Sequence, residues 1–212
     1  GVNSDELSVK AEAAPGYKYT TWSALQEAIT AAPGDATTPA TKTTTIRLTE
    51  NLTAPAEGGA AITIPEGKNI TIDLNGKTID RGLSEKDPAA NGSVIINNGT
   101  LTIKDSSTGK TGTITGGNAT FGGAIVSNGT TTLESGTITG CKATSTDYDS
   151  ANSKLGRGGA IYVPYTGTFT MTGGEIKDCS ASVAGGAIFN VGTVNITGGK
   201  IDGCSVSGLG TV

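Results

Sequence analysis

Apolar and polar residues alternate over short stretches from Thr43 to the end of the chain. The clearest early stretches are 45–49, 61–64 and 70–74, followed by 77–79 after an Asn75-Gly76 turn. An alternation with a period of two places every second side chain on the same face. The pattern therefore predicts a succession of short strands, each with one buried face, separated by tight turns.

One earlier segment has helical spacing. Leu25, Ala28 and Ile29 fall on one face of a helix over residues 21–32, and Ser23 can cap its start. The segment predicts a short amphipathic helix ahead of the first strand.

The chain repeats itself from Ser93 onward. The element Gly-Gly-Ala-Ile begins at Gly122, Gly158 and Gly185, with a looser copy at Gly92. Each copy is followed by a Gly-Thr strand and then by a third strand, and the Gly-Thr strands begin 30, 38 and 25 residues apart. Because the strand order is fixed while the spacing varies, we expect each unit to form one coil of a solenoid. Equivalent strands would stack in parallel about 4.8 Å apart.

Residues at equivalent positions of the units form columns, and three columns are apolar or nearly so. We expect these columns to fill the core. They are Ile95/Ile125/Ile161/Ile188, Leu101/Thr131/Phe169/Val194 and Ile103/Leu133/Met171/Ile196.

Three cysteines share one position in the last three units. In successive coils Cys141, Cys179 and Cys204 would lie about 4.8 Å apart with parallel side chains. The functional alternatives are a metal site and a disulfide. Three Cys without His give the wrong ligand number for zinc, and an odd number leaves one thiol unpaired. We therefore expect a ladder of buried free thiols that pack as small apolar side chains.

The Gly-Gly-Ala-Ile units and the amphipathic segment ahead of them resemble right-handed parallel β-helices of the pectin-lyase-like superfamily. They are similar to adhesin-like bacterial surface proteins with GGAI repeats, and distantly to the chlamydial polymorphic outer membrane proteins, in which GGAI alternates with an FxxN element. With the strand pattern, this resemblance predicts an all-β fold, a right-handed parallel β-helix with three short strands per coil and an N-terminal capping helix. It also implies an extracellular protein, secreted or on a bacterial cell surface.

The chain divides into a tail and one domain. Residues 1–19 are polar and predict a linker, and residues 20–212 predict a single β-helix. Within it, 20–92 supply the cap and first coils and 93–212 the GGAI-type repeats. The residues after Cys204 look like the start of another coil, so we expect this chain to be part of a longer protein. An open last coil could associate end to end.

The composition excludes several classes of function. The chain has 212 residues, 33 Gly, no His and a formal net charge of -4. Without His there is no Ser-His or Cys-His pair, and the commonest zinc ligand and general base are missing. With no Lys/Arg-rich run, nucleic acid is not an expected partner. No apolar run approaches the roughly 20 residues that span a bilayer, so this segment is not expected to insert into a membrane. No cofactor is expected.

The carboxylates do not form a catalytic pattern. Enzymes of the resembled superfamily use Asp clusters with Ca²⁺ or paired Asp, and this chain has no Asp-Asp doublet and no Arg-x-Lys. Asp147 and Asp149 could offer oxygens to Ca²⁺, but a lone Asp-x-Asp in a loop is usually solvated. We expect a non-enzymatic stalk or ligand-presenting scaffold. The alternative is a polysaccharide lyase or hydrolase whose catalytic coils are lost or have diverged.

Three tyrosines lie in or just after the longest insertion, 142–157. Tyr148 is inside it, and Tyr162 and Tyr165 follow. Tyr162 belongs to the column next to the Ile column, which alternation turns outward. Such a column could bind a glycan or a matrix protein, unless the chain turns there or another segment covers it. The full column is Ile96, Val126, Tyr162 and Phe189.

A Thr-x-Thr pattern marks the outward side of the Gly-Thr strands. It comprises Thr100/Thr102, Thr130/Thr132 and Thr168/Thr170, and Asn195 interrupts it in the last unit. Ice-binding solenoids present a similar array. The simpler interpretation is that Thr suits exposed strand positions.

Overall fold

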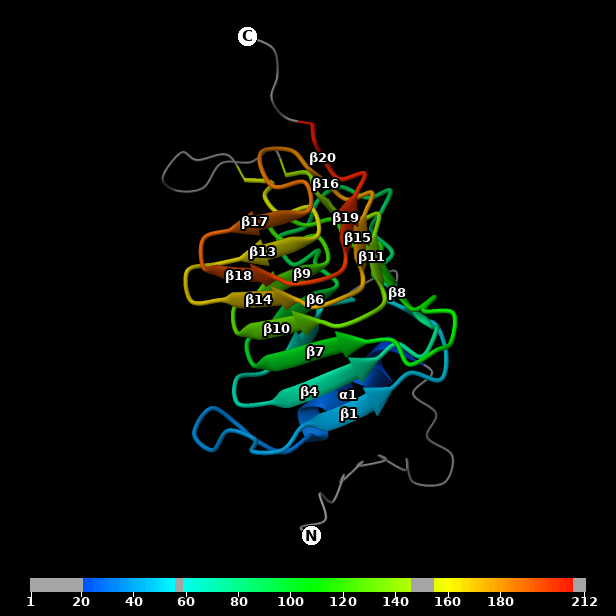
Figure 1. The fold of residues 1–212 in the computed structure, drawn as a ribbon, viewed down its shortest axis with the longest axis vertical. Coiled ribbons are helices and arrows are strands. Elements are labelled where there is room, and N and C mark those ends of the chain that lie inside the picture. Colours follow the sequence, from blue (N-terminus) through cyan, green and yellow to red (C-terminus); the bar gives the residue numbers. More distant parts are fainter. Residues whose placement is uncertain (1–20, 56–58, 146–154, 208–212) are drawn as a thin grey trace.

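The computed structural model describes residues 21–55, 59–145 and 155–207. Within these ranges the chain forms one helix, α1 (Trp22–Ala31), followed by twenty short strands. Figure 1 shows the strands stacked along the long axis of the molecule, with α1 near the end where the chain begins.

The strands form four sheets. Sheet A contains β1 (Thr44–Arg47), β4 (Asn69–Asp73), β7 (Thr100–Lys104), β10 (Thr130–Leu133), β14 (Thr168–Met171) and β18 (Thr193–Ile196). Sheet B contains β2 (Leu52–Thr53), β5 (Thr78–Asp80), β8 (Thr113–Thr115), β11 (Thr137–Thr139), β15 (Glu175–Lys177) and β19 (Lys200–Asp202). Sheet C contains β3 (Ile62–Ile64), β6 (Ile95–Asn97), β9 (Ile125–Ser127), β13 (Ile161–Val163) and β17 (Ile188–Asn190). The fourth sheet contains β12 (Lys142–Ala143), β16 (Ser180–Ala181) and β20 (Ser205–Val206).

The strands pair in parallel with the equivalent strands of neighbouring coils. Thr130, for example, pairs with Thr100 on one side and Thr168 on the other. The chain visits sheets C, A and B in the same order in each coil. This arrangement is a parallel β-solenoid, which confirms the predicted fold class.

The structure adds two features to the predicted coil. The three expected strands are sheets C, A and B, but the last three coils each carry a fourth strand of two residues. Its inward side chains in β12 and β16 are Ala143 and Ala181, both buried. An early strand, β2, was also not predicted. Strands of two residues are too short for an alternating pattern to reveal.

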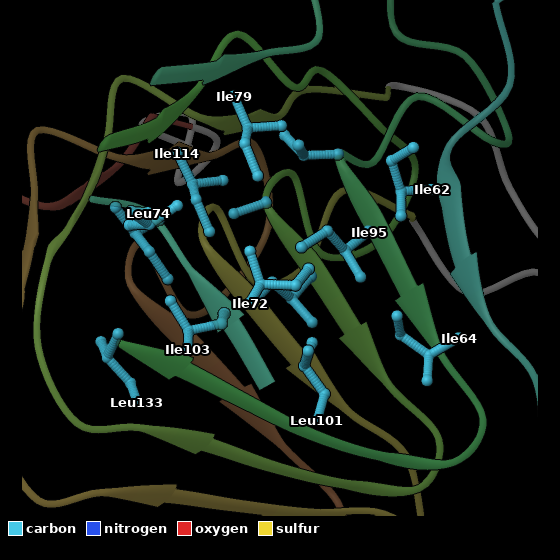
Figure 2. Close-up of a cluster of buried hydrophobic side chains, with 14 of the residues drawn as sticks. Ile62, Ile64, Ile72, Leu74, Ile79, Ile95, Leu101, Ile103, Ile114 and Leu133 are labelled. Atoms are coloured by element: carbon cyan, nitrogen blue, oxygen red, sulfur yellow. The ribbon is translucent and has the colours of Figure 1, made fainter. Parts of the chain in front are cut away.

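The core is a stack of apolar side chains that point into the coil from three sheets (Figure 2). The Ile column extends one coil further than expected, because Ile62 pairs with Ile95. Ile95, Ile125 and Ile161 are fully buried, whereas Ile188 in the last coil is only half-buried. The side chains drawn in Figure 2 come from different coils yet converge on one interior.

The helix α1 covers the first coil. Leu25 and Ile29 are fully buried, as the helical spacing predicted. The predicted cap, Ser23, is wrong: Thr21 is the N-cap, and its hydroxyl accepts a hydrogen bond from the Ala24 N–H at 3.1 Å. The helix begins at Trp22, so Ser23 already lies inside the first turn and cannot occupy the extended backbone of an N-cap.

Polar contacts fasten α1 to sheet C. The Gln26 side-chain oxygen accepts from the Thr63 N–H at 2.7 Å, and its amide nitrogen donates to the Thr63 carbonyl at 3.0 Å. The Gln26 amide thereby pairs with β3 as a neighbouring strand would. The Trp22 indole donates to the Ala60 carbonyl at 2.9 Å. The N-terminal edge of sheet C is therefore closed by side chains of the helix.

Candidate functional site

The outer face of sheet C carries a column of large apolar side chains, Ile96, Val126, Tyr162 and Phe189, here called the outer stripe. Cross-strand pairing places its members in register over four successive coils. Each is half-buried, while the Ile column beside it turns into the core. The outward direction expected from strand alternation is therefore present at Tyr162.

Two phenylalanines contact the Tyr162 ring. The centroid of Phe121 lies 4.7 Å from that of Tyr162 with the planes tilted by 37°. The ring of Phe189, one coil later, stacks nearly parallel on Tyr162 at 5.8 Å. Parallel strands repeat the same side-chain direction every coil, so rings in one column stack along the solenoid axis. Phe121 precedes β9 and Phe189 lies in β17, so the two rings approach Tyr162 from different coils.

A guanidinium adds a positive charge to this cluster. The Arg157 guanidinium carbon lies 5.4 Å from the centroid of the Phe189 ring. An exposed cation over an aromatic ring contributes about 0.5–1 kcal/mol. Phe121, Arg157, Tyr162 and Phe189 together form what we call the aromatic patch. The aromatic patch combines three aromatic rings with a guanidinium on the outer face of sheet C.

Tyr165 lies apart from the aromatic patch. It occupies the turn between β13 and β14, which the Gly167 N–H closes by donating to the Pro164 carbonyl at 2.8 Å. Its side chain is 85% exposed, the largest exposure among the large apolar side chains of the described residues. The rings that contact Tyr162 come instead from Phe121 and Phe189. Tyr148, Asp147 and Asp149 lie outside the described residues.

Sequence reasoning missed Phe121 and Arg157. Both directly precede a Gly-Gly-Ala-Ile element, as does Ala184. The structure joins these three positions by isolated parallel bridges. An alignment of the repeats extended by one residue upstream would have placed them in one column beside the outer stripe.

The cysteines form the predicted column. The Ser180 N–H donates to the Cys141 carbonyl, and the Ser205 N–H donates to the Cys179 carbonyl at 2.9 Å, which places the three residues in register. All three are free thiols; Cys141 and Cys179 are buried and Cys204 is half-buried. A hydrogen bond with the Cys141 thiol, and then burial, raise the pKa of Cys179. Burial raises the pKa of Cys204. Thiols with raised pKa values are poor nucleophiles and poor metal ligands.

The two most buried carboxylates are engaged by turns. Asp105 is 1% exposed. Its Oδ1 accepts from the N–H groups of Gly76 at 2.8 Å and Ser107 at 3.0 Å, and its Oδ2 accepts from Gly112 at 2.6 Å. Burial raises the pKa of Asp105, but these backbone donors outweigh it, so the pKa lies below the usual value. Asp73 likewise accepts from two backbone N–H groups and lies 3.6 Å from Arg47. These carboxylates organise backbone and are not positioned toward solvent as an acid and a base.

The outward threonines of sheet A are present as predicted. Thr100 and Thr130 are exposed, and Thr102, Thr132 and Thr170 are half-buried in register with one another. The array does not extend unchanged through the stack. Thr71, at the same position one coil before Thr102, is buried, and Asn195 follows Thr170.

No group of three or more His, Cys, Asp or Glu side chains within the described residues is placed to hold a metal ion. The single helix in this part of the chain is too short to cross a membrane. Comparison of the chain with protein-family models, with curated proteins and with solved structures found no match.

Proposed function

We propose that this protein is a non-enzymatic scaffold that presents the outer face of sheet C to a partner. The observation that carries the proposal is the outer stripe with its aromatic patch, apolar and half-buried over four successive coils. Continuous apolar surface rimmed by polar residues is typical of interaction sites. The GGAI repeats, which resemble those of adhesin-like bacterial proteins, support an extracellular or cell-surface role.

The stacking of the rings favours contact with a protein surface over stacking of a sugar on Tyr162. Tyr162 is contacted by rings from the coils on either side, so a sugar ring has little access to its face. Tyr165 and the Arg157 guanidinium remain available, the first as an exposed ring and the second as a hydrogen-bond donor. This chemistry suits a protein surface, which can pack against ring edges and pair with a cation. A glycan can use the Tyr165 ring.

The solenoid makes such a surface rigid. Each residue of the outer stripe lies on a strand that is hydrogen-bonded to neighbouring strands. A preorganised surface loses little conformational entropy on binding, which favours affinity from shallow contacts. Repetition along the axis further suits a partner that itself repeats.

The test compares binding by the whole chain and by substituted variants. Immobilised pectin, alginate, mucin-type glycans and collagen serve as probes, and both bound protein and released sugar are measured. We expect saturable binding to one of these probes without release of product. Release of new sugar ends would contradict the scaffold and support the alternative, a carbohydrate-active β-helix. Absence of binding to every probe, glycan and protein alike, would also count against the proposal.

Substitution of the exposed tyrosine separates binding from folding. Tyr165→Ser should weaken binding by about 1–3 kcal/mol if the exposed ring beside the outer face of sheet C contacts the partner, as for an aromatic hot spot. It should leave the melting temperature nearly unchanged because the ring is 85% exposed. Thr130→Ser, on the outer face of sheet A, is the matched control. If Arg157→Gln binds like the unsubstituted protein, the aromatic patch is a packing feature, and if Tyr165→Ser does so too, neither the patch nor the exposed Tyr165 contacts the partner.

A further inference from the structure

Sheets C and A meet at a corner of the solenoid where three successive turns stack on one another. The first two, 98–99 and 128–129, are Asn-Gly turns. The third, 164–167, is two residues longer and exposes Tyr165. The strands on both sides of these turns are paired in register, so the turns follow one another at the coil spacing of about 4.8 Å.

The two asparagines of this corner form an amide ladder. The Asn128 amide nitrogen donates to the Asn98 side-chain oxygen at 2.7 Å on the surface of the molecule. No other hydrogen bond joins either side chain to a described residue. An Asn amide carries two N–H donors and an oxygen that accepts twice. The ladder therefore leaves donors and acceptors at the surface that an external ligand can use.

Tyr165 adds an aromatic ring one coil further along the same corner. A long hydrogen bond of 3.5 Å from the Thr166 hydroxyl to the Asn128 carbonyl ties its turn to the preceding one. Tyr162 differs, because its ring is contacted by two phenylalanine rings, whereas the Tyr165 ring has no aromatic or cationic neighbour among the described residues. An exposed ring with free faces thus lies next to free amide groups.

The charges of this corner disfavour an anionic ligand. Among the described turns from sheet C to sheet A, only 65–68 contains charged residues, Glu66 and Lys68. The Lys68 ammonium donates to the carbonyls of Thr30, at 3.1 Å, and of Ala32. The exposed Glu66 carboxylate and the formal net charge of -4 would both repel a polyanion.

We infer that Asn98, Asn128 and Tyr165, here called the corner ridge, bind a neutral glycan that lies along the solenoid axis. Sugar hydroxyls exchange hydrogen bonds with the two amides, and the apolar face of a sugar ring packs on the Tyr165 ring. The three turns span about 10 Å, which accommodates a short run of linked sugars. A protein partner fits less well, because the ridge lacks the apolar centre of a protein interface.

The inference rests on the proposed function and names the ligand class for its Tyr165 side. Isothermal titration calorimetry of the whole chain tests it, with galactomannan, laminarin and dextran as neutral probes and pectin and alginate as acidic ones. We expect saturable binding to a neutral probe. The double substitution Asn98→Ala with Asn128→Ala should weaken that binding at least about 10-fold, because several hydrogen bonds are lost. Tyr165→Phe should retain binding, since it keeps the ring, and Tyr165→Ser should lose it.

The matched control is Asn91→Ala, because Asn91 is exposed in the connection that leads into sheet C and not on the corner ridge. It should leave glycan binding unchanged. The side chains of Asn98 and Asn128 bond only to each other, so the double variant should keep the melting temperature of the unsubstituted protein. Thermal unfolding of each variant separates loss of binding from loss of the fold.

Four outcomes would overturn the inference: no binding to a neutral probe, binding to acidic probes only, unchanged binding by the double variant, and equal loss in the Asn91→Ala control. If the chain binds collagen, and Arg157→Gln weakens that binding while no neutral glycan binds, the scaffold remains and only the corner ridge is excluded. Binding to none of the glycan and protein probes would contradict both the inference and the proposed function.

Discussion

Asp105 shows how one buried carboxylate fixes a corner of the solenoid. Its two oxygens accept three backbone N–H groups that belong to two different turns, around Gly76 and around Ser107 to Gly112. The first turn requires stabilisation because Asn75 and Gly76 both have positive φ angles, 48° and 73°. A charged acceptor holds such donors more strongly than water does once the corner is buried. The side chain therefore links neighbouring coils at a corner where no strand pairs.

The pH dependence of stability should report this role. Because the pKa of Asp105 in the folded protein lies below its usual value, the carboxylate stabilises the fold above the unfolded-state pKa. That contribution is lost as the pH falls through the lower folded-state pKa. Asp105→Asn should lower the free energy of unfolding at neutral pH by about 1–3 kcal/mol, since buried N–H donors lose a charged acceptor. It should also flatten the decline of stability toward acid.

Urea unfolding of both proteins between neutral and strongly acidic pH measures this effect. The exposed Asp87 supplies the control, Asp87→Asn, which should change the curve little. A variant Asp105→Asn as stable as the unsubstituted protein at every pH would show that the turns hold without the charge.

A second residue-scale feature is a buried polar cluster inside an apolar column. Thr131 shares its column with Leu101 and Phe169 and is fully buried. Its hydroxyl contacts the Ser127 hydroxyl at 2.7 Å and accepts from the Asn97 amide at 2.9 Å. The polar group is thus satisfied by residues of two coils, which is why the column tolerates it.

At the scale of elements, the solenoid could be predicted from the sequence because the pattern that marks each strand is local and recurs in every coil. Alternation marks each strand of three to five residues, and the repeats set the order of strands. The fourth sheet and β2 escape this reasoning, since two residues such as Lys142 and Ala143 carry no period. The N-cap was misplaced by two residues because Thr21 and Ser23 are both good caps, and only the backbone of the first turn distinguishes them.

The candidate site was less predictable than the fold. The outward direction of Tyr162 follows from alternation, but the contacts of its ring depend on Phe121, which lies one residue upstream of the Gly-Gly-Ala-Ile element and outside any alternating stretch. Arg157 is likewise outside any named strand. Alternation within one strand carries no information about such connecting residues, whereas comparison of the repeats places both in one column.

The helix α1 gives a prediction at this scale. Gln26→Ala removes both hydrogen bonds to Thr63 and leaves the N–H of a covered strand edge without its acceptor. The free energy of unfolding should fall by about 1–3 kcal/mol. Amide exchange at Thr63 should accelerate more than exchange in the middle coils.

Glu27→Ala is the matched control, because Glu27 is exposed on the same helix. Both proteins are compared by thermal unfolding and by hydrogen exchange. Equal effects of the two substitutions would mean that helix propensity, and not the contact with β3, accounts for the loss.

At the scale of the whole molecule, stability should vary along the axis. In a stacked repeat protein each coil is stabilised mainly by its two neighbours. The last described coil has a neighbour on one side only, while α1 substitutes for the missing neighbour at the other end. Amides of β18 and β19 should therefore exchange faster than those of β7 and β10, and the first coils should remain protected.

This gradient is best measured on the unsubstituted chain, because Lys200 in β19 pairs with Glu175 and Asp202 and its substitution would itself change exchange in the last described coil. Exchange that is uniform along the axis would show instead that the solenoid opens as one cooperative unit. Exchange that is fastest at β1 and β3 would show that α1 does not protect its end.

Differences in coil length are confined to particular corners. Turns from sheet C to sheet A span two residues in three coils, 98–99, 128–129 and 191–192, and turns from sheet A to sheet B span three in the last three coils. The chain lengthens most at the corner that leads into sheet C, with residues 81–94 in one coil and 144–160 in another, and once between sheets A and B, at residues 105–112. The pairing of Thr130 with Thr168 is unchanged across the longest of these connections. New sequence can therefore be inserted at these corners, or a whole coil duplicated, while the packing of the other coils stays the same.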